Sequence, residues 1–282
     1  MPLTTTTEML LDAQRGGYAV GAFNVENMEM VQAVVEAAES LGSPVILQTT
    51  PSTVKYGGLD QYHAMVTAAA ARATVPVALH LDHGDSFELS ARALRVGYTS
   101  VMFDGSSRPY DENVAISAAV VRMCAPAGIP VEGELGKVGG KEDSLHVAEV
   151  AYTDPDQAAD FVERTGVSSL AVAIGTAHGV YSGVPVLDVA LLARIRLTVD
   201  IPLVLHGGSG LSDDAIRECI RTGIAKVNFA TELRIAFSRA VATYLGDAPT
   251  TIDPKKYGAV ARTAVRDLAL AKMRLCASGS GA

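Results

Sequence analysis

Hydrophobic residues in this chain fall into short runs, and longer segments with helical spacing separate those runs. Most runs stop at a polar residue or a glycine, a pattern typical of buried parallel strands joined by amphipathic helices. The predicted strands are Tyr18–Phe23, Val45–Gln48, Val77–Leu81, Ser100–Phe103, Val131–Leu135, Leu170–Ile174, Leu203–Leu205 and Ala225–Asn228. The predicted helices are Thr7–Arg15, Met28–Ser40, Tyr62–Ala73, Ser86–Arg95, Asp111–Cys124, Pro155–Thr165, Ser212–Arg221 and Thr231–Tyr244.

Eight such strands in one chain are the number that closes a (β/α)8 barrel. Four of them begin directly after a proline, at a position where proline costs no ladder hydrogen bond: Pro44, Pro76, Pro130 and Pro202. An open doubly wound sheet is the alternative, but it is expected to bind its ligand near a glycine-rich first turn, which this sequence lacks. We therefore predict an α/β fold, a single-domain (β/α)8 TIM barrel.

Composition adds limits on partners and location. The chain has 282 residues, 49% of them hydrophobic, and a net charge of −8 at pH 7. Lysine and arginine are scattered, so neither nucleic acid nor an anionic membrane surface is expected as a partner. The three cysteines stand outside any metal or redox motif, and no secretory leader or apolar run of membrane length is visible. We expect one cytoplasmic domain over residues 1–282, with an active-site loop at 136–150 and a C-terminal extension at 245–282.

Polar side chains gather at or just beyond the predicted strand ends. In a closed barrel those ends meet on one face, where active sites of this fold are built. Three of only six histidines lie there, namely His83, His178 and His206. Three neutral imidazoles around an open position form a catalytic site for a divalent metal, most naturally zinc. The other strand-end residues are Asn24, Thr50, Asp82, Asp104, Glu134 and Asn228.

A single histidine is more often structural or superficial than a ligand, so the joint placement of the three carries the metal hypothesis. His80 is a useful comparison because it lies inside the third predicted strand. We expect it to fill the barrel interior or to hold a neighbour through a hydrogen bond. We assign no function to His63, which lies on a predicted helix, or to His146, which lies in a long loop.

Two short turns follow the seventh and eighth strands and lead into helices. They read His206-Gly-Gly-Ser-Gly210 and Asn228-Phe-Ala-Thr231. Glycine frees backbone N–H groups to point at an anion, and a helix N-terminus favours negative charge. One such turn alone would be ordinary. The pair, in the loops where barrels of this fold bind phosphate, predicts a phosphate site.

The segment from Gly136 to Val150 is too long and too rich in glycine for a plain connector. Long loops on the active face of a barrel often act as lids, and closure would deliver Glu142 to the site. A solvated, charged loop is the other interpretation.

Five ordered motifs extend these observations: His80-Leu-Asp-His-Gly84, Glu132-Gly-Glu-Leu-Gly136 with Gly139-Gly-Lys-Glu-Asp143, Ala173-Ile-Gly-Thr-Ala-His-Gly179, Leu205-His-Gly-Gly-Ser-Gly210 and Asn228-Phe-Ala-Thr-Glu232. Together they resemble the class II, metal-dependent ketose-bisphosphate aldolases, which include fructose- and tagatose-bisphosphate aldolases, over essentially the whole chain. The resemblance implies reversible aldol cleavage of a ketose 1,6-bisphosphate of tagatose or fructose type. The products would be dihydroxyacetone phosphate and an aldehyde such as glyceraldehyde 3-phosphate, with zinc stabilising the enediolate.

The resemblance also implies roles for individual residues. Asp82 matches the proton donor, and Glu142 matches the loop acid that abstracts the C–H proton. His83, His178 and His206 match the zinc ligands, whereas Asp104 and Glu134 match a second or alternate metal site. The predicted substrate-binding residues are Asn24, Thr50, Gly179, Gly207, Gly208, Ser209, Asn228, Phe229, Ala230 and Thr231. Family members are commonly homodimers or homotetramers that act on small phosphorylated sugars, often with a monovalent cation such as Na⁺ or K⁺ near the phosphate.

Three positions depart from the family pattern. Asp104-Gly-Ser-Ser107 replaces a more usual Asp-Ala-Ser, and Ser144 follows Glu142-Asp where a second acid is frequent. Ala230 stands where fructose-specific members can carry an acid, which favours a tagatose-type or other ketose.

Two further functions remain open from the sequence. One is a Schiff-base aldolase, since Lys226 is the only lysine inside a predicted strand. The other is a non-catalytic partner subunit of an aldolase, although such a subunit should have lost metal ligands that this chain retains. A metal-dependent hydrolase would be expected to carry a His-x-His strand motif, which is absent.

Overall fold

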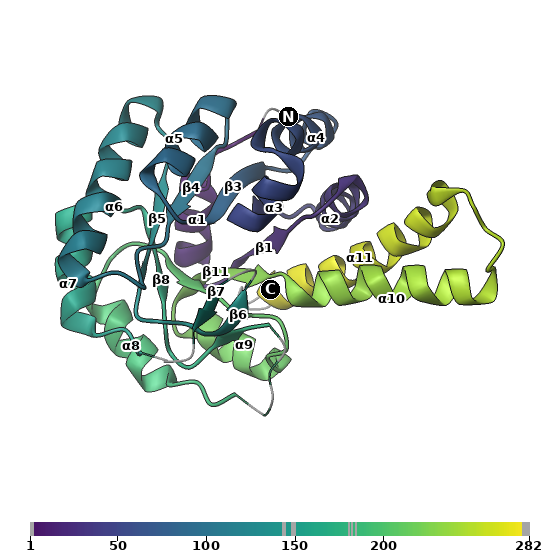
Figure 1. Cartoon of the computed structure of the whole chain (residues 1–282). Helices are drawn as coiled ribbons and strands as arrows, with labels where there is room; N and C mark the ends of the chain where they lie inside the picture. Colours follow the sequence, from purple (N-terminus) through teal and green to yellow (C-terminus); the bar gives the residue numbers. More distant parts are fainter. Residues whose placement is uncertain are drawn as a thin grey trace.

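Eight parallel strands close a barrel in the order β1, β2, β3, β4, β5, β8, β10 and β11, and β11 then pairs with β1 (Figure 1). This confirms the predicted (β/α)8 TIM barrel. The structure, a computed structural model, describes residues 3–142, 145–147, 151–179, 181, 183 and 185–277, with backbone alone at 141, 142 and 145–147. The barrel strands are β1 (Val20–Asn24), β2 (Val45–Thr49), β3 (Val77–Gly84), β4 (Ser100–Phe103), β5 (Val131–Leu135), β8 (Ser169–Val172), β10 (Leu203–Leu205) and β11 (Ile224–Phe229).

Helices cover the outside of the barrel, and local signals set many of their ends. Asn27, Ser86 and Ser212 each accept a backbone N–H at a helix start, while Gly42 and Gly97 end helices in the left-handed conformation. The helices are α1 (Thr7–Gly16), α2 (Met28–Leu41), α3 (Pro51–Gly57), α4 (Leu59–Ala70), α5 (Phe87–Val96), α6 (Tyr110–Cys124), α7 (Pro155–Thr165), α8 (Val189–Thr198), α9 (Asp213–Arg221), α10 (Thr231–Asp247) and α11 (Pro254–Ala277).

The apolar core has two parts, because side chains alternate along each barrel strand. A large cluster between strands and helices includes Leu47, Leu79 and Phe103. A smaller cluster joins α1 to the intervening strand residues, among them Ala22 and Ala78. The barrel interior nearer the carboxyl ends of the strands is polar. The site described below lies in this polar part.

The structure adds elements that the hydrophobic pattern did not predict. Helix α8 begins after Asp188, whose carboxylate accepts the N–H of Leu191, and this capping signal was present in the sequence. Helix α3 directly follows Thr50. A three-stranded sheet outside the barrel is formed by β6 (Gly139–Glu142), β7 (Leu145–Val147) and β9 (Ala177–His178). Part of the predicted loop at 136–150 is therefore strand, and the rest of it lies partly outside the described residues.

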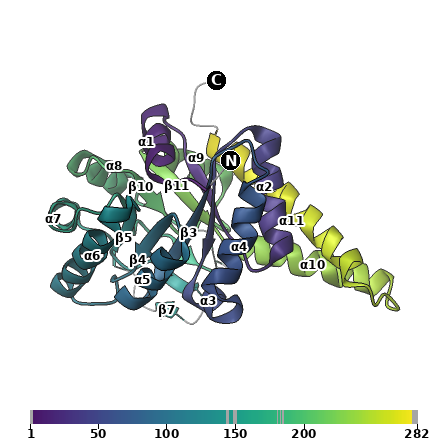
Figure 2. The same cartoon turned by 90° about the horizontal axis from the view of Figure 1, so that it is seen from above.

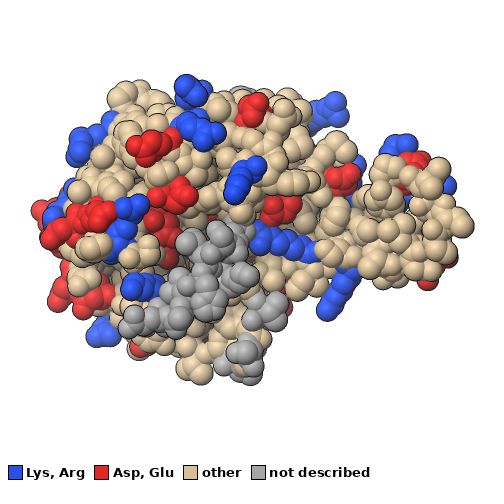
Figure 3. Space-filling view, viewed as in Figure 1, with Lys and Arg blue, Asp and Glu red and all other residues tan. Residues whose placement is uncertain are grey.

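The last two helices form a hairpin that projects from the barrel (Figures 1 and 2). Helix α11 returns along α10 and packs against α2. Among the described residues of α10, Leu233 alone is fully buried, and Ile252 in the connecting turn is 93% exposed. None of the helices in the described part of the chain combines the length and apolar character that crossing a bilayer requires. Figure 3 shows basic and acidic side chains interspersed over the face that it displays.

Candidate active site

An irregularity in β3 brings Asp82 and His83 into the same site. Where β3 pairs with β4, the register shifts between Leu81 and Gly84, so these two residues lie in a bulge. A bulge re-aims side chains that would otherwise alternate between the faces of a sheet. His83 has a φ of 48°, in the left-handed region that residues other than glycine seldom adopt. Both side chains are consequently buried at one strand end.

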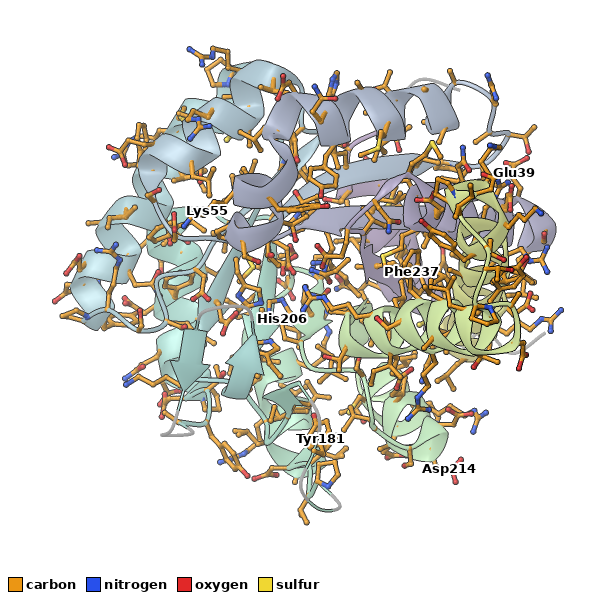
Figure 4. All side chains as sticks on the ribbon, turned by 45° about the vertical axis from the view of Figure 1, so that its right-hand side comes forward. Glu39, Lys55, Tyr181, His206, Asp214 and Phe237 are labelled. Atoms are coloured by element: carbon orange, nitrogen blue, oxygen red, sulfur yellow. The ribbon has the colours of Figure 1, made fainter. Side chains whose placement is uncertain are left out.

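Three histidines meet from three different segments. The ring centres of His83 and His206 are 4.6 Å apart, those of His83 and His178 are 5.0 Å apart, and those of His178 and His206 are 5.9 Å apart. Their candidate ligand nitrogens all lie within 4.8 Å of one another. Figure 4 shows the labelled His206 close to the centre of the molecule. The structure thus gathers the three histidines chosen from the sequence into a group that can hold a divalent cation.

Two carboxylates lie beside the histidines. Asp104 Oδ2 is hydrogen-bonded to His83 Nδ1 at 2.8 Å, and Glu134 joins them in a second group whose ligand atoms also lie within 4.8 Å of one another. Burial raises the pKa of the Asp104 carboxyl, but the hydrogen bond and charge of His83 outweigh burial and hold that pKa well below its usual range. An ionised Asp104 can act as an oxygen ligand or can orient His83.

Two atoms at the centre of the site test whether a cation fits. Glu134 Oε2 and His206 Nδ1 are buried and lie 3.1 Å apart, within ion-pair distance, but neither atom makes a hydrogen bond of good geometry in the described structure. A buried polar atom without a hydrogen bond costs about 1–3 kcal/mol. A divalent cation coordinated by the imidazoles and carboxylates would satisfy both atoms. The mixed nitrogen and oxygen donors suit zinc.

The far nitrogen of His206 is held by a buried ion pair. His206 Nε2 lies 3.0 Å from Glu132 Oε1, and Lys226 Nζ lies 2.8 Å from Glu132 Oε2. Burial lowers the pKa of His206, but its contacts with Glu132 and Glu134 outweigh burial and raise that pKa to about 9. A hydrogen bond of this kind to one ring nitrogen fixes the ring so that the other nitrogen, Nδ1, faces the metal group.

His80 lies beside this ion pair, inside β3 and three residues before His83, as the sequence suggested. Its Nδ1 lies 2.8 Å from Ser100 Oγ, and its Nε2 lies 3.5 Å from Lys226 Nζ. Burial and the nearby charge of Lys226 lower the pKa of His80 to about 3. His80 is therefore neutral and belongs to the polar layer beneath the site.

These contacts give Lys226 a structural role that can be measured. Its side chain is fully buried and paired with Glu132, so Lys226→Met would remove the cation at Glu132 Oε2 and leave that buried carboxylate, among the hydrogen bonds described, with the contact to His206 Nε2. We expect this variant to lose about 3–5 kcal/mol of unfolding free energy, measured by urea denaturation. Lys256→Met, at an exposed position of α11, is the matched control and should unfold like the wild type. Unchanged stability of Lys226→Met would contradict this role, and a borohydride-trapped substrate adduct on Lys226 would support the Schiff-base alternative.

Three amide side chains surround Asp82. Asn24 Nδ2 and Gln48 Nε2 each donate to Oδ2 at 3.0 Å, and Asn228 Nδ2 donates to Oδ1 at 3.2 Å. Gln48 Nε2 also donates to Asn24 Oδ1 at 2.8 Å. The two asparagines were predicted as substrate-binding residues, and the structure places both against Asp82. Gln48 was not predicted as a site residue. It lies within a strand, and its polarity alone does not reveal which side chains it faces in the closed barrel.

The two predicted phosphate turns are joined to one another. The Gly208 N–H donates to the Asn228 carbonyl at 3.1 Å, and the Ala230 N–H donates to Ser209 Oγ at 3.1 Å. Gly208 also allows a close approach, since a Cβ there would lie 2.7 Å from the Asn228 oxygen. The turns after β10 and β11 therefore form a single surface.

That surface retains unused donors. Over the described parts of the chain, no hydrogen bond uses the backbone N–H of Gly207 or Ser209. Helix α10 begins at Thr231, and the partial positive charge of its N-terminus adds to these donors. The arrangement suits a phosphate group.

The remaining predicted residues are placed as follows. Thr50 is buried and caps α3, with its Oγ1 lying 3.1 Å from Thr53 Oγ1. Gly179 follows His178 with a φ of 89°. The Phe229 ring stacks on Phe23 with 5.5 Å between centres, so any contact of Phe229 with substrate would use its backbone. The Glu142 side chain and His146 side chain lie outside the described residues.

A closed barrel that gathers three histidines, a carboxylate held by three amides, and a turn surface with unused backbone N–H groups is an arrangement typical of metal-dependent enzymes that act on small phosphorylated substrates. The model of the class-II fructose-bisphosphate aldolase family matches residues 4–280, so this chain belongs to that family and is an aldolase, a carbon–carbon lyase. The family is generally metal-dependent, in agreement with the side chains gathered here.

Solved structures agree with this assignment. The YdjI aldolase from Escherichia coli K12 is 39% identical, with a TM-score of 0.87 and coverage of 99% of this chain and 98% of that chain. The fructose-bisphosphate aldolase of Campylobacter jejuni is 23% identical, with a TM-score of 0.78 and coverage of 99% of this chain and 95% of that chain. The second likeness shows a shared fold.

Proposed function

We propose that this protein catalyses the reversible, zinc-dependent aldol cleavage of a ketose 1,6-bisphosphate of tagatose or fructose type. The products are dihydroxyacetone phosphate and an aldehyde such as glyceraldehyde 3-phosphate. The observation that carries the proposal is the convergence of His83, His178 and His206 next to Asp82 and its cage of amides. When bound, zinc supplies a Lewis acid that stabilises the negative charge of the enediolate formed on carbon–carbon cleavage.

Asp82 is the group proposed to exchange a proton with the oxygen of the aldehyde half. In the cleavage direction its carboxylate accepts the proton of the hydroxyl that becomes the aldehyde, and in condensation it returns that proton. The N–H groups of Asn24, Gln48 and Asn228 hold both carboxylate oxygens in place. The caged carboxylate is thereby fixed in orientation relative to the histidines, as efficient proton transfer requires.

Glu142 is proposed to exchange the proton on carbon of the dihydroxyacetone phosphate half. Its backbone belongs to β6, and Gly140 of the same strand pairs with His178. The strand that carries the acid is thus attached to a strand that carries a metal ligand. This proximity supports the assignment, since general acid–base catalysis needs the acid within reach of the reacting carbon.

The phosphate of dihydroxyacetone phosphate is assigned to the turns after β10 and β11. The unused N–H groups of Gly207 and Ser209 and the start of α10 at Thr231 support this assignment. Gly208, Phe229 and Ala230 contribute through their backbone, and Gly179 lies beside the ligand His178. Thr50 is proposed to face the aldehyde half. The small side chain of Ala230 favours a tagatose-type ketose.

Asp104 and Glu134 can hold a second or alternate divalent ion with His83, and the phosphate surface is the proposed place for a monovalent cation such as Na⁺ or K⁺. The projecting α10–α11 hairpin supports a homodimer or homotetramer. The three free cysteines, all buried, support a cytoplasmic location.

Metal removal tests the proposal directly. We expect a strong chelator to abolish cleavage of the preferred ketose bisphosphate and stoichiometric zinc to restore it, because no side chain described here can replace the Lewis acid. Fructose 1,6-bisphosphate, tagatose 1,6-bisphosphate and a deoxy-ketogluconate phosphate should be compared in one coupled assay. Full activity after verified metal removal would overturn the proposal. An enzyme that is zinc-dependent but inactive on both bisphosphates would correct only the substrate.

Neither alternative is favoured by the structure. Lys226 is fully buried and ion-paired with Glu132, whereas a Schiff-base lysine must meet a carbonyl as a free amine. A non-catalytic partner subunit would not need the complete histidine group together with a caged acid.

A further inference from the structure

Different backbone elements hold the three candidate metal ligands in place. His83 is the last residue but one of barrel strand β3 and His206 directly follows β10, whereas His178 belongs to β9, which pairs with β6 outside the barrel. Barrel strand β8 ends at Val172, before the segment that leads to His178. The barrel ladder therefore fixes two ligands, and something else must fix His178 relative to them.

Tyr181 makes that connection through its hydroxyl group. Its oxygen accepts the N–H of Ala177 at 2.9 Å and donates to the carbonyl of Gly207 at 2.9 Å. Ala177 directly precedes His178, and Gly207 directly follows His206. One hydroxyl thus joins the peptide units next to two of the three ligands, and Figure 4 shows Tyr181 on the side of the molecule that carries the small sheet.

Close backbone packing makes this spacing strict. A Cβ on Gly207 would lie 2.4 Å from the Ala177 oxygen, so the two segments touch through their backbones. A Cβ on Gly210 would lie 3.0 Å from the Tyr181 ring, so the ring itself rests on the phosphate turn. Tyr181 is mostly buried, and burial raises the pKa of its phenol, which stays protonated and able to donate.

We propose that Tyr181 is a positioning residue, which sets the separation of His178 from His206 and thereby the affinity of the site for its metal. The proposal rests on the three-histidine ligand set of the proposed function. Tyr181 touches neither metal nor substrate in this role. It acts through the two peptide groups that it bridges, as groups behind metal ligands commonly do.

The test is Tyr181→Phe in the full-length chain, which keeps the ring on Gly210 and removes only the bridge. Zn²⁺ affinity is measured by competition with a chromophoric chelator, and the Co²⁺-loaded protein is examined by visible absorption spectroscopy. We expect affinity to fall by about 10-fold to 100-fold and the cobalt bands to change, since the ligand geometry relaxes.

Tyr98→Phe is the matched control. Its side chain is buried, its hydroxyl lies 2.9 Å from Thr49 Oγ1, and none of the hydrogen bonds described for it involves a candidate ligand. We expect this variant to keep the wild-type Zn²⁺ affinity and cobalt spectrum. Wild-type affinity and spectrum in Tyr181→Phe would overturn the positioning role. Failure of the wild-type protein to bind Zn²⁺ would instead overturn the ligand set, which is the failure of the proposed function.

Discussion

His178→Ala is expected to abolish both zinc retention and aldol cleavage. The variant removes one of three imidazoles whose ligand nitrogens lie within 4.8 Å of one another. A catalytic zinc site built on three protein ligands has no spare ligand to lose. Since changes behind such ligands cost about 10-fold to 100-fold in metal affinity, loss of a ligand itself should cost more. Zinc content after gel filtration and the initial rate of ketose-bisphosphate cleavage are the two measurements.

The control for this variant is His63→Ala. His63 is on α4, where Thr67 Oγ1 lies 3.3 Å from its Nε2, and it is not part of the histidine group. Its replacement should leave the zinc content and the cleavage rate unchanged. If His178→Ala retained full zinc and a normal rate, the assignment of the metal ligands would be wrong, whatever the substrate of the enzyme.

The barrel was predictable because its signals are local and repeated. A proline before an apolar run marks the start of β2, β3, β5 and β10, and each run is followed by a polar residue or a glycine. The small sheet was not predictable from the same signals. Its strand β9 has only two residues, and it is held by pairing with β6, which lies far away in the sequence. Such a strand has no hydrophobic period of its own.

The same difference separates the site residues that the sequence predicted from those that it did not. His83, His178 and His206 were predicted because ends of parallel strands converge on one face of a barrel. Gln48, Glu132 and Lys226 lie within strands, and their roles depend on which residues the closed barrel places opposite them. Gln48 pairs in register with Asn24 on one side and with His80 on the other. That register is a property of the closed sheet, so no motif in one strand reveals it.

Asp82→Ala should separate proton transfer from metal binding. Asp82 is buried within its cage of Asn24, Gln48 and Asn228, and it is not a member of either candidate metal group. We therefore expect zinc content to remain that of the wild type while the cleavage rate falls by about 10²–10⁴, the usual contribution of a positioned general acid or base.

Asp85→Ala provides the comparison, because Asp85 is exposed three residues further along and its carboxylate accepts only the hydroxyl of Ser86 among the contacts described. Its cleavage rate should match the wild type. Two results for Asp82→Ala would count against the proton-transfer role. Loss of zinc would show that Asp82 is needed for metal binding. The lower cleavage rate could then be explained by the missing metal and would not be evidence for proton transfer. An unchanged cleavage rate with full zinc would show that another group exchanges the proton with the aldehyde oxygen, and the three amides would then have to be explained as support for the fold alone.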